Sequence, residues 1–330
     1  MPEITCIGLT HEEFGKPDEV LHLQEMELAS PESGEVLIEM EAAAIHPSDL
    51  GMIGGSYGQL RELPAVAGRE GVGRVIEVGP GVEADWKGRL VRIPEEPGAW
   101  RTLQVARVEG LSMVPSKIPV DQAALAAINP TTAFRLLEDF CDLQEGDWIV
   151  QNAGNSAVGV AVIQLARSKG IHTASLVRRE ELFGPMRELG ADLVLLDDRA
   201  AVDAIREATK GARVPLGLNS VGGSSVLTVA QSLSDEGTVV TFGGMTGEKI
   251  RFPTRQLIFN DISFRGFWMD RWKRSRTAEE WQQLLDRVYK AIEDGVIHTP
   301  VEKSFPLASF REALEANESG RMGKILFHNG

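Results

Sequence analysis

Segment 148–180 carries the clearest ligand-binding pattern of the chain and reads WIVQNAGNSAVGVAVIQLARSKGIHTASLVRRE. An apolar run predicts a buried strand, the small residues 152–154 predict a tight turn, and a helical pattern of apolar residues then ends at Gly170. Backbone N–H groups and the positive end of the helix dipole would meet where that helix starts, and small side chains let a pyrophosphate approach the backbone. The segment therefore predicts a βαβ unit that binds a dinucleotide.

The second strand of this unit ends in Arg178 and Arg179, where an acidic side chain would bond the ribose of NAD. Guanidinium groups bond a 2′-phosphate through charge-assisted hydrogen bonds, whereas an aspartate would repel it. The sequence therefore predicts NADP(H) rather than NAD(H). The turn keeps only Gly154 and Gly159 of the usual glycine pattern, and the alternative for the two arginines is an ordinary solvated loop.

Length and composition indicate a globular protein of two domains, with 330 residues, 43% of them hydrophobic and 25% charged. The net charge of −14 argues against a surface that binds nucleic acid or anionic lipid. Cys6 and Cys141 are too few for a disulfide framework or a structural zinc site. The first twenty residues are acidic, and no apolar segment is long enough to cross a bilayer, so we expect a cytoplasmic location without membrane contact.

The pattern of the chain changes near residue 121. Short alternating segments with glycine and proline, such as EVLIEMEAAAI and GVGRVIEVG, predict a β-rich, barrel-like domain before it. After it, helices alternate with strands, beginning with AALAAINPTTAFRLLEDF, and predict an α/β domain with a doubly wound parallel sheet. An amphipathic helix is expected over 277–294, and the tail predicts a helix and a strand that return to the first domain. The expected domains are 1–121 with 296–330, and 122–295.

The motifs HPSDL, GGSYG, LPAVAGREGVG, NPTTAFRLL, QNAGNSAVG, FGGM, LIF, RGFW and GRMGKIL occur in this order along nearly the whole chain. Together they resemble the medium-chain dehydrogenase/reductase superfamily, and within it the NADPH-dependent trans-2-enoyl thioester reductases of the mitochondrial type. The resemblance implies an α/β fold in which a GroES-like β-rich domain is joined to a Rossmann domain with a doubly wound parallel sheet. It also implies NADPH as the cofactor and a homodimer.

The resemblance places the proton donor of these reductases on Tyr57 in GGSYG. Hydride attack on the β-carbon of an enoyl thioester leaves an enolate, which is basic enough at its α-carbon to take a proton from a phenol of pKa about 10. The alternative for Tyr57 is an aromatic residue that covers the edge of a cleft.

Further site residues follow from the same resemblance. Those implied to contact the cofactor are Asn129, Asn155, Ser156, Ala157, Val158, Arg178, Arg179, Glu180, Phe242, Gly243, Gly244, Met245, Phe267, Trp268, Met269 and Lys324. Asn129 and Lys324 could instead be a turn cap and a surface lysine. Residues expected near the substrate are His46, Trp100, Trp268, Arg271, Lys273 and Arg274.

The zinc alcohol dehydrogenases of the same superfamily need Cys and His ligands in the segments that read IHPSD and GREGVG in this chain. His46 stands where the Cys would be, and Arg69 stands where the His would be. Because arginine does not give up a proton to bind metal, we expect no catalytic zinc. Without a Lewis acid, reduction of an activated C=C bond is favoured over oxidation of an alcohol. His46 is then expected to be a hydrogen-bonded structural histidine or one at the edge of the substrate.

Arg271, Lys273 and Arg274 belong to a basic run that stands out on an acidic protein. They could form a docking patch for the phosphates of CoA or for an acyl-carrier protein, or they could lie in a solvated loop and helix start. Three functions remain open from the sequence: reduction of an enoyl thioester, reduction of a quinone or small enone, and non-catalytic binding of NADPH.

Overall fold

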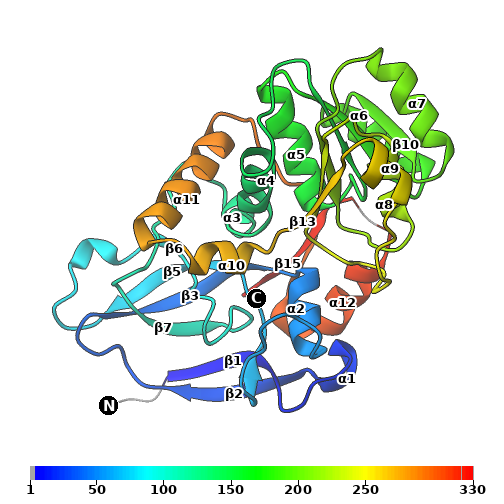
Figure 1. The fold of residues 1–330 in the computed structure, drawn as a ribbon. Helices are drawn as coiled ribbons and strands as arrows, with labels where there is room; N and C mark the ends of the chain where they lie inside the picture. Colours follow the sequence, from blue (N-terminus) through cyan, green and yellow to red (C-terminus); the bar gives the residue numbers. More distant parts are fainter. Residues whose placement is uncertain (1–3, 321, 330) are drawn as a thin grey trace. The chain divides into compact units, whose positions relative to one another are not determined.

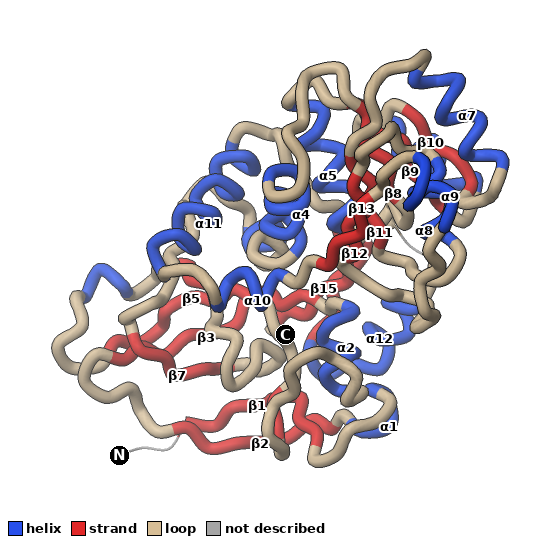
Figure 2. The backbone as a smooth tube through the Cα atoms, viewed as in Figure 1, coloured by secondary structure: helices blue, strands red, loops and turns tan. Residues whose placement is uncertain are grey.

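The computed structural model describes residues 4–320 and 322–329, so Arg321 of the GRMGKIL motif and the outermost residues of the expected domains lie outside the described residues. Contacts divide the chain into two compact units. Unit 1 comprises Met1–Ile128, Ala278–Glu293 and Thr299–Gly330, and unit 2 comprises Asn129–Thr277 and Asp294–His298. Both contain helices and strands (Figure 2), which confirms the α/β fold class.

Unit 1 is built on two β-sheets, as the alternating segments of the sequence predict. The larger has the order β14-β15-β3-β5-β6, with β7 paired to β3, and the smaller has the order β2-β1-β4. The strands are β1 (Ile4–His11), β2 (His22–Leu28), β3 (Glu35–Ala44), β4 (Ala65–Val66), β5 (Gly71–Val78), β6 (Leu90–Arg92), β7 (Leu103–Arg107), β14 (Val301–Pro306) and β15 (Lys324–His328). The helices are α1 (Pro17–Val20), α2 (Pro47–Ile53), α3 (Val120–Ala123), α11 (Ala278–Glu293) and α12 (Phe310–Glu318). Strand β15 lies antiparallel to β3, so the tail returns to the first part of the chain.

Unit 2 contains a six-stranded parallel sheet in the order β10-β9-β8-β11-β12-β13, and Figure 1 labels its two edge strands, β10 and β13. This order, in which the first strand lies in the middle and the chain winds outward in both directions, is that of a Rossmann fold. The strands are β8 (Trp148–Gln151), β9 (His172–Val177), β10 (Leu193–Leu196), β11 (Leu216–Asn219), β12 (Thr238–Thr241) and β13 (Ser263–Gly266). The helices are α4 (Asn129–Glu138), α5 (Ala157–Ser168), α6 (Phe183–Glu188), α7 (Ala200–Thr209), α8 (Ser225–Gln231), α9 (Thr254–Phe259) and α10 (Met269–Arg274).

Two elements differ from the expectation. The first helix expected after residue 121 is two helices, because α3 ends at Ala123 and α4 begins again at Asn129 with Pro130 in its first turn, where a proline costs no hydrogen bond. Helix α11 has the predicted apolar face, but it belongs to unit 1 rather than to the Rossmann unit. Its Gln282 accepts a hydrogen bond of 2.7 Å from Ser112, which ties it to the β-rich unit.

Candidate active site

The turn between β8 and α5 in unit 2 fits the pyrophosphate of a dinucleotide. Ser156 caps α5, and its side chain accepts a hydrogen bond of 3.1 Å from the Gly159 N–H. A Cβ at Gly154 would lie 2.7 Å from the Cβ of Ser175, and a Cβ at Gly159 would lie 2.5 Å from the Gly154 carbonyl oxygen. The two retained glycines therefore let the turn lie close to β9, and the partly exposed residues 155–158 present backbone at the start of the helix.

The other cofactor residues expected in unit 2 gather at the same edge of the sheet. Arg178 and Arg179 follow β9 directly and are exposed, as is Glu180, which begins a short 3₁₀ turn. Residues 242–245 follow β12, and residues 267–269 follow β13. Because all six strands are parallel, their carboxyl ends lie along one edge, where such folds bind ligands. Asn129 is buried at the start of α4.

A polar network that we did not predict from the sequence lies at this edge. Asn152 Nδ2 donates to Asn219 Oδ1 over 2.7 Å and to Ser225 Oγ over 2.8 Å. Ser225 Oγ in turn donates to Asp197 Oδ2 over 2.5 Å. Burial raises the pKa of Asp197 above its usual value. The signal in the sequence was the aspartate that follows the apolar run of β10, but its partners come from three other segments.

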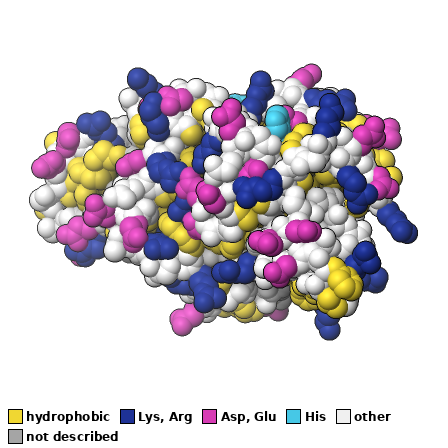
Figure 3. Space-filling view, turned by 45° about the horizontal axis from the view of Figure 1, so that its top comes forward, with side chains coloured by type: hydrophobic (Ala, Val, Ile, Leu, Met, Phe, Trp, Pro, Cys, Tyr) yellow, Lys and Arg dark blue, Asp and Glu magenta, His cyan; other side chains and the backbone are white. Residues whose placement is uncertain are grey.

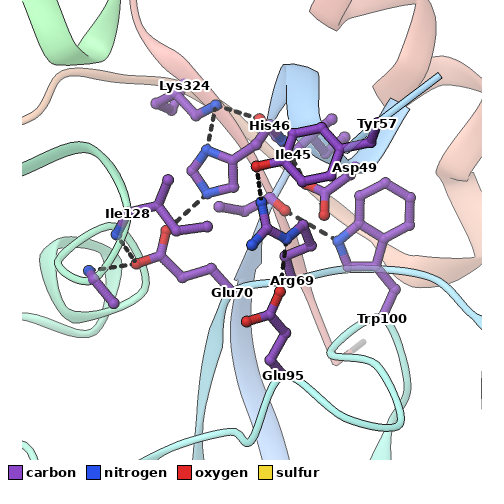
Figure 4. A network of polar contacts seen from close by, with 12 residues as sticks. Ile45, His46, Asp49, Tyr57, Arg69, Glu70, Glu95, Trp100, Ile128 and Lys324 are labelled. Atoms are coloured by element: carbon purple, nitrogen blue, oxygen red, sulfur yellow. Dashed lines mark hydrogen bonds and ion pairs between the residues drawn. The ribbon is translucent and has the colours of Figure 1, made fainter. Parts of the chain in front are cut away.

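In unit 1, Tyr57 lies directly against Arg69 (Figure 4). Tyr57 follows helix α2 in a turn where its N–H donates to the Gly51 carbonyl over 3.1 Å. Arg69 Nη1 donates to Tyr57 Oη over 2.8 Å, and the guanidinium carbon lies 4.9 Å from the centre of the tyrosine ring. Arg69 is only 4% exposed, and its Nε donates to Glu95 Oε1 over 2.7 Å. The expected proton donor is thus held by a buried cation.

His46 belongs to a second network of buried charged groups, with Glu70 and Lys324, which lies next to Tyr57 and Arg69 (Figure 4). Its Nε2 lies 2.7 Å from Glu70 Oε2, and its Nδ1 lies 3.4 Å from Lys324 Nζ. Lys324 also donates to the Ile45 carbonyl, and Glu70 Oε1 accepts from the backbone N–H of Ile128 over 3.1 Å. Burial lowers the pKa of His46, and the ammonium of Lys324 lowers it further. The neutral imidazole therefore donates from Nε2 to Glu70 and accepts at Nδ1 from Lys324.

These side chains do not fit a zinc ion. Both ring nitrogens of His46 face protein partners, and the guanidinium of Arg69 carries donors only. Asp49 is also buried, its Oδ2 accepts from the His46 N–H over 2.7 Å, and burial raises its pKa. Across residues 4–320 and 322–329, no group of three or more His, Cys, Asp or Glu side chains could hold a metal ion.

The sequence reasoning missed the parts played by Asp49 and Glu70. Both carboxylates are buried and hydrogen-bonded beside His46. Both lie in the motifs HPSDL and GREGVG, so an acidic residue among mostly small or apolar neighbours was the available signal.

The structure places two of the expected site residues differently. Trp100 is fully buried, its Nε1 donates to the Ala44 carbonyl over 3.0 Å, and its ring packs edge-on against Phe327 at 5.1 Å. We expected Trp100 near the substrate, but it is a core residue with no exposed surface for a substrate to contact. Lys324 is only 5% exposed, which excludes a surface lysine, and its ammonium points into the network around His46.

The basic residues expected near the substrate lie on and beside α10. Arg271 and Arg274 are exposed and Lys273 is half-buried. Arg274 stacks its guanidinium over the ring of Trp268 at 4.7 Å. The aromatic and cationic groups of this segment therefore form one surface cluster in unit 2.

Comparison with known proteins matches both units. Residues 32–104 match the alcohol dehydrogenase GroES-like domain, and residues 157–290 match a family described as zinc-binding dehydrogenase. The chain is 40% identical over 317 residues to the mitochondrial enoyl-[acyl-carrier-protein] reductase of Rattus norvegicus, covering 94% of this chain and 85% of the relative. Among the described residues, no helix is both long enough and apolar enough to span a bilayer.

Solved structures agree with this match. The Etr1p/NADP/crotonyl-CoA complex superposes with a TM-score of 0.89 at 25% identity, covering 98% of this chain and all of the other. A putative NADPH:quinone reductase from Bacillus thuringiensis superposes with a TM-score of 0.90 at 24% identity, covering 99% and 100%, and shows the fold alone. The cytoplasmic location expected from the sequence is wrong by these comparisons, because the rat relative and others like it are named as mitochondrial proteins.

Proposed function

Because the chain belongs to the family of mitochondrial enoyl-acyl-carrier-protein reductases, we propose that it reduces the C=C bond of a trans-2-enoyl thioester with NADPH. The observation that carries this proposal is the 40% identity over 94% of the chain. The turn between β8 and α5 and the two arginines that follow β9 support NADPH as the cofactor. The name of the relative supports a mitochondrial place of action.

The chemical step that we assign to the side chains of this protein is the donation of one proton to the substrate. NADPH, when bound, supplies a hydride to the β-carbon of the enoyl group. The resulting enolate carries its negative charge over the thioester carbonyl and the α-carbon. We propose that the hydroxyl of Tyr57 gives its proton to the α-carbon and is reloaded from water. Residues 155–158 would hold the pyrophosphate, and Arg178 and Arg179 would hold the 2′-phosphate.

The test is the oxidation of NADPH by crotonyl-CoA, hexenoyl-CoA and a simple quinone, with wild type and Tyr57→Phe. The expected result is thioester turnover that falls by about 100-fold or more in Tyr57→Phe, as for a lost general acid. Tyr289→Phe is the matched control, because Tyr289 is the other tyrosine of the chain and is buried in the core of unit 1. Quinone turnover without thioester turnover would overturn the proposal, and so would tight NADPH binding without turnover of any alkene.

We propose an acyl-carrier protein or CoA as the carrier that docks on the cluster at α10. The protein has a net charge of −14, and cationic and acidic side chains are interspersed on the face drawn in Figure 3, so a phosphate-bearing partner needs a local patch. Arg271, Lys273 and Arg274 provide one. Their triple alanine variant should raise KM for acyl-CoA or acyl-carrier protein about tenfold or more and leave KM for a short thioester unchanged. Equal effects on both would exclude docking, and alanine at Arg199, Arg206 and Lys210 controls for the loss of three charges.

We also propose a homodimer that forms at the β13 edge of the Rossmann sheet. Strand β13 ends the sheet order and is largely exposed, which leaves an edge that a second copy can extend. In α9, the helix that precedes β13 along the chain, Ile258 and Phe259 are 65% and 71% exposed. Neighbouring apolar side chains that are both this exposed add to an apolar patch of the kind that marks protein–protein interfaces.

A further inference from the structure

We propose that Arg69 is a positioning residue for proton transfer, which aims the hydroxyl of Tyr57 and stabilises the phenolate left when its proton departs. This inference rests on the proposed role of Tyr57 as the proton donor. In the sequence, Arg69 served only as a reason to exclude zinc. The contacts of Arg69 on which the inference depends, with Tyr57 and Glu95, lie within unit 1.

The direction of the Arg69–Tyr57 hydrogen bond carries the first step. A guanidinium has five N–H donors and no acceptor, so Tyr57 Oη must be the acceptor over the 2.8 Å between them. The hydroxyl proton of Tyr57 is therefore not used in this bond. A lone pair of the oxygen is fixed by Arg69, which limits the directions in which the proton can point.

The second step is that Arg69 is itself held rigidly. Its side chain is 3% exposed, and its Nε bonds to Glu95 Oε1 over 2.7 Å while Nη1 bonds to Tyr57. The guanidinium also lies over the tyrosine ring at 4.9 Å, so it restrains the ring as well as the oxygen. A planar fork fixed at two points loses little further freedom when it holds Tyr57.

The third step is the change of charge during the reaction. When the O–H bond of Tyr57 breaks and a C–H bond forms at the α-carbon, the electron pair of the O–H bond stays on Oη as a phenolate. Arg69 stays protonated throughout, so its bond to Oη becomes a charge-assisted pair in a buried setting. This interaction strengthens only as the proton leaves, and such an interaction lowers the barrier rather than merely binding substrate.

Other charged groups around the pair do not cancel this effect. Glu95 offsets the charge of Arg69 but lies at Nε, on the opposite side of the guanidinium from the bond to Tyr57. Asp49 is close enough for Arg69 to lower its pKa, but burial outweighs this and leaves that pKa raised. Glu70 and Lys324 are engaged with His46.

A double-mutant cycle tests the proposal with crotonyl-CoA and NADPH, using Arg69→Gln, Tyr57→Phe and the double variant. Arg69→Gln should lower kcat about 10- to 100-fold, as expected for loss of a hydrogen bond to a charged group, with little change in KM for the thioester. In the Tyr57→Phe background the same change should cost less than about threefold, because the hydroxyl on which it acts is absent. The control is Arg61→Gln, since the side chain of Arg61 is also largely covered, at 9% exposed, but bonds to the carbonyls of Val66 and Gly68; its effect should be the same in both backgrounds.

A spectroscopic titration gives a second readout that does not depend on turnover. The chain has two tyrosines, and burial raises the pKa of Tyr289 to about 12, so in Tyr289→Phe the near-ultraviolet absorbance of phenolate reports Tyr57 alone. The phenolate should form at higher pH after Arg69→Gln, because a nearby cation favours the negative charge. Arg69→Lys, which keeps the charge without the fork, should restore part of this shift but little of kcat.

The outcomes separate the two proposals. If Tyr57→Phe lowers turnover but the losses from Arg69→Gln multiply with it, or if the titration of Tyr57 does not move, the inference about Arg69 is overturned and the proposed function stands. If Tyr57→Phe leaves thioester turnover intact, the proposed proton donor is wrong.

Discussion

The buried network around His46 predicts a loss of stability in mild acid. Both ring nitrogens are engaged, with Glu70 at Nε2 and the Lys324 ammonium 3.4 Å from Nδ1. A proton added at Nδ1 would set two cations against each other, and burial together with Lys324 holds the pKa of His46 below its usual 6.5. The unfolded chain therefore takes up a proton at this histidine in mild acid that the folded chain does not bind.

The size of the effect follows from linkage. Because the unfolded state binds more protons below its pKa of 6.5, stability rises with pH there and falls as the pH drops toward the lowered folded pKa. At pH 5.5, one unit below 6.5, the histidine of the unfolded chain is mostly protonated, so the loss of stability relative to pH 7.5 approaches about 1.4 kcal/mol while the folded imidazole stays neutral. For a unit of this size, that is about 3–6 °C in the melting temperature.

The assay compares wild type with His46→Gln by calorimetry from about pH 7.5 to 5.5. The variant should be less stable at neutral pH by about 1–3 kcal/mol, because Glu70 and Lys324 lose a partner in the core. Its deficit should then shrink by up to about 1.4 kcal/mol at pH 5.5, because it has no histidine to protonate there. Asp49, whose raised pKa gives the opposite slope, is present in both proteins and keeps the hydrogen bond from the backbone N–H of residue 46.

The control is His172→Gln, because the side chain of His172 is 45% exposed rather than buried. Parallel curves for wild type and His46→Gln would refute the reasoning. A deficit that grows in acid would mean that His46 is protonated in the fold and forms an ion pair with Glu70.

Three further predictions concern unit 2. Gly154→Ala places a methyl group 2.7 Å from the Cβ of Ser175, so calorimetry should show a loss of about 1–3 kcal/mol and fluorescence titration should show weaker NADPH binding; unchanged values would mean that the turn can shift. Replacing Arg178 and Arg179 with serine should raise KM for NADPH about 10- to 100-fold and leave KM for NADH nearly unchanged, which steady-state kinetics would test; a parallel rise for both would locate the arginines away from the 2′-phosphate. Phe259→Asp should shift sedimentation toward monomer without unfolding the protein, and an unchanged dimer would remove α9 from the proposed interface.

Local patterns predicted unit 2 well because each part of it is encoded within a short segment. The strand, turn and helix of residues 148–170 have the expected order, and the helix stops just before Gly170, which adopts a positive φ of 68°. The single helix expected over 123–140 was only partly right. The helical pattern of alanines runs on without interruption in the sequence, but the helix is interrupted there by contacts with a distant residue. That break occurs where the backbone N–H groups of Ala127 and Ile128 donate to Glu70, 57 and 58 residues away.

The charged cluster of unit 1 could not be predicted in this way, because its members meet only after the sheet has formed. His46 lies 24 residues from Glu70 and 278 residues from Lys324, and strand β15 brings Lys324 beside the end of β3. The sequence alone shows that residue 69 is an arginine, and because a guanidinium has no lone pair to offer, this was enough to exclude it as a metal ligand. An exclusion does not say what the residue does, and its contact with Tyr57, twelve residues earlier, is a fact of folded geometry. The same substitution that removes a Lewis acid thus places a permanent cation against the expected proton donor, and this favours chemistry in which a proton leaves a phenol.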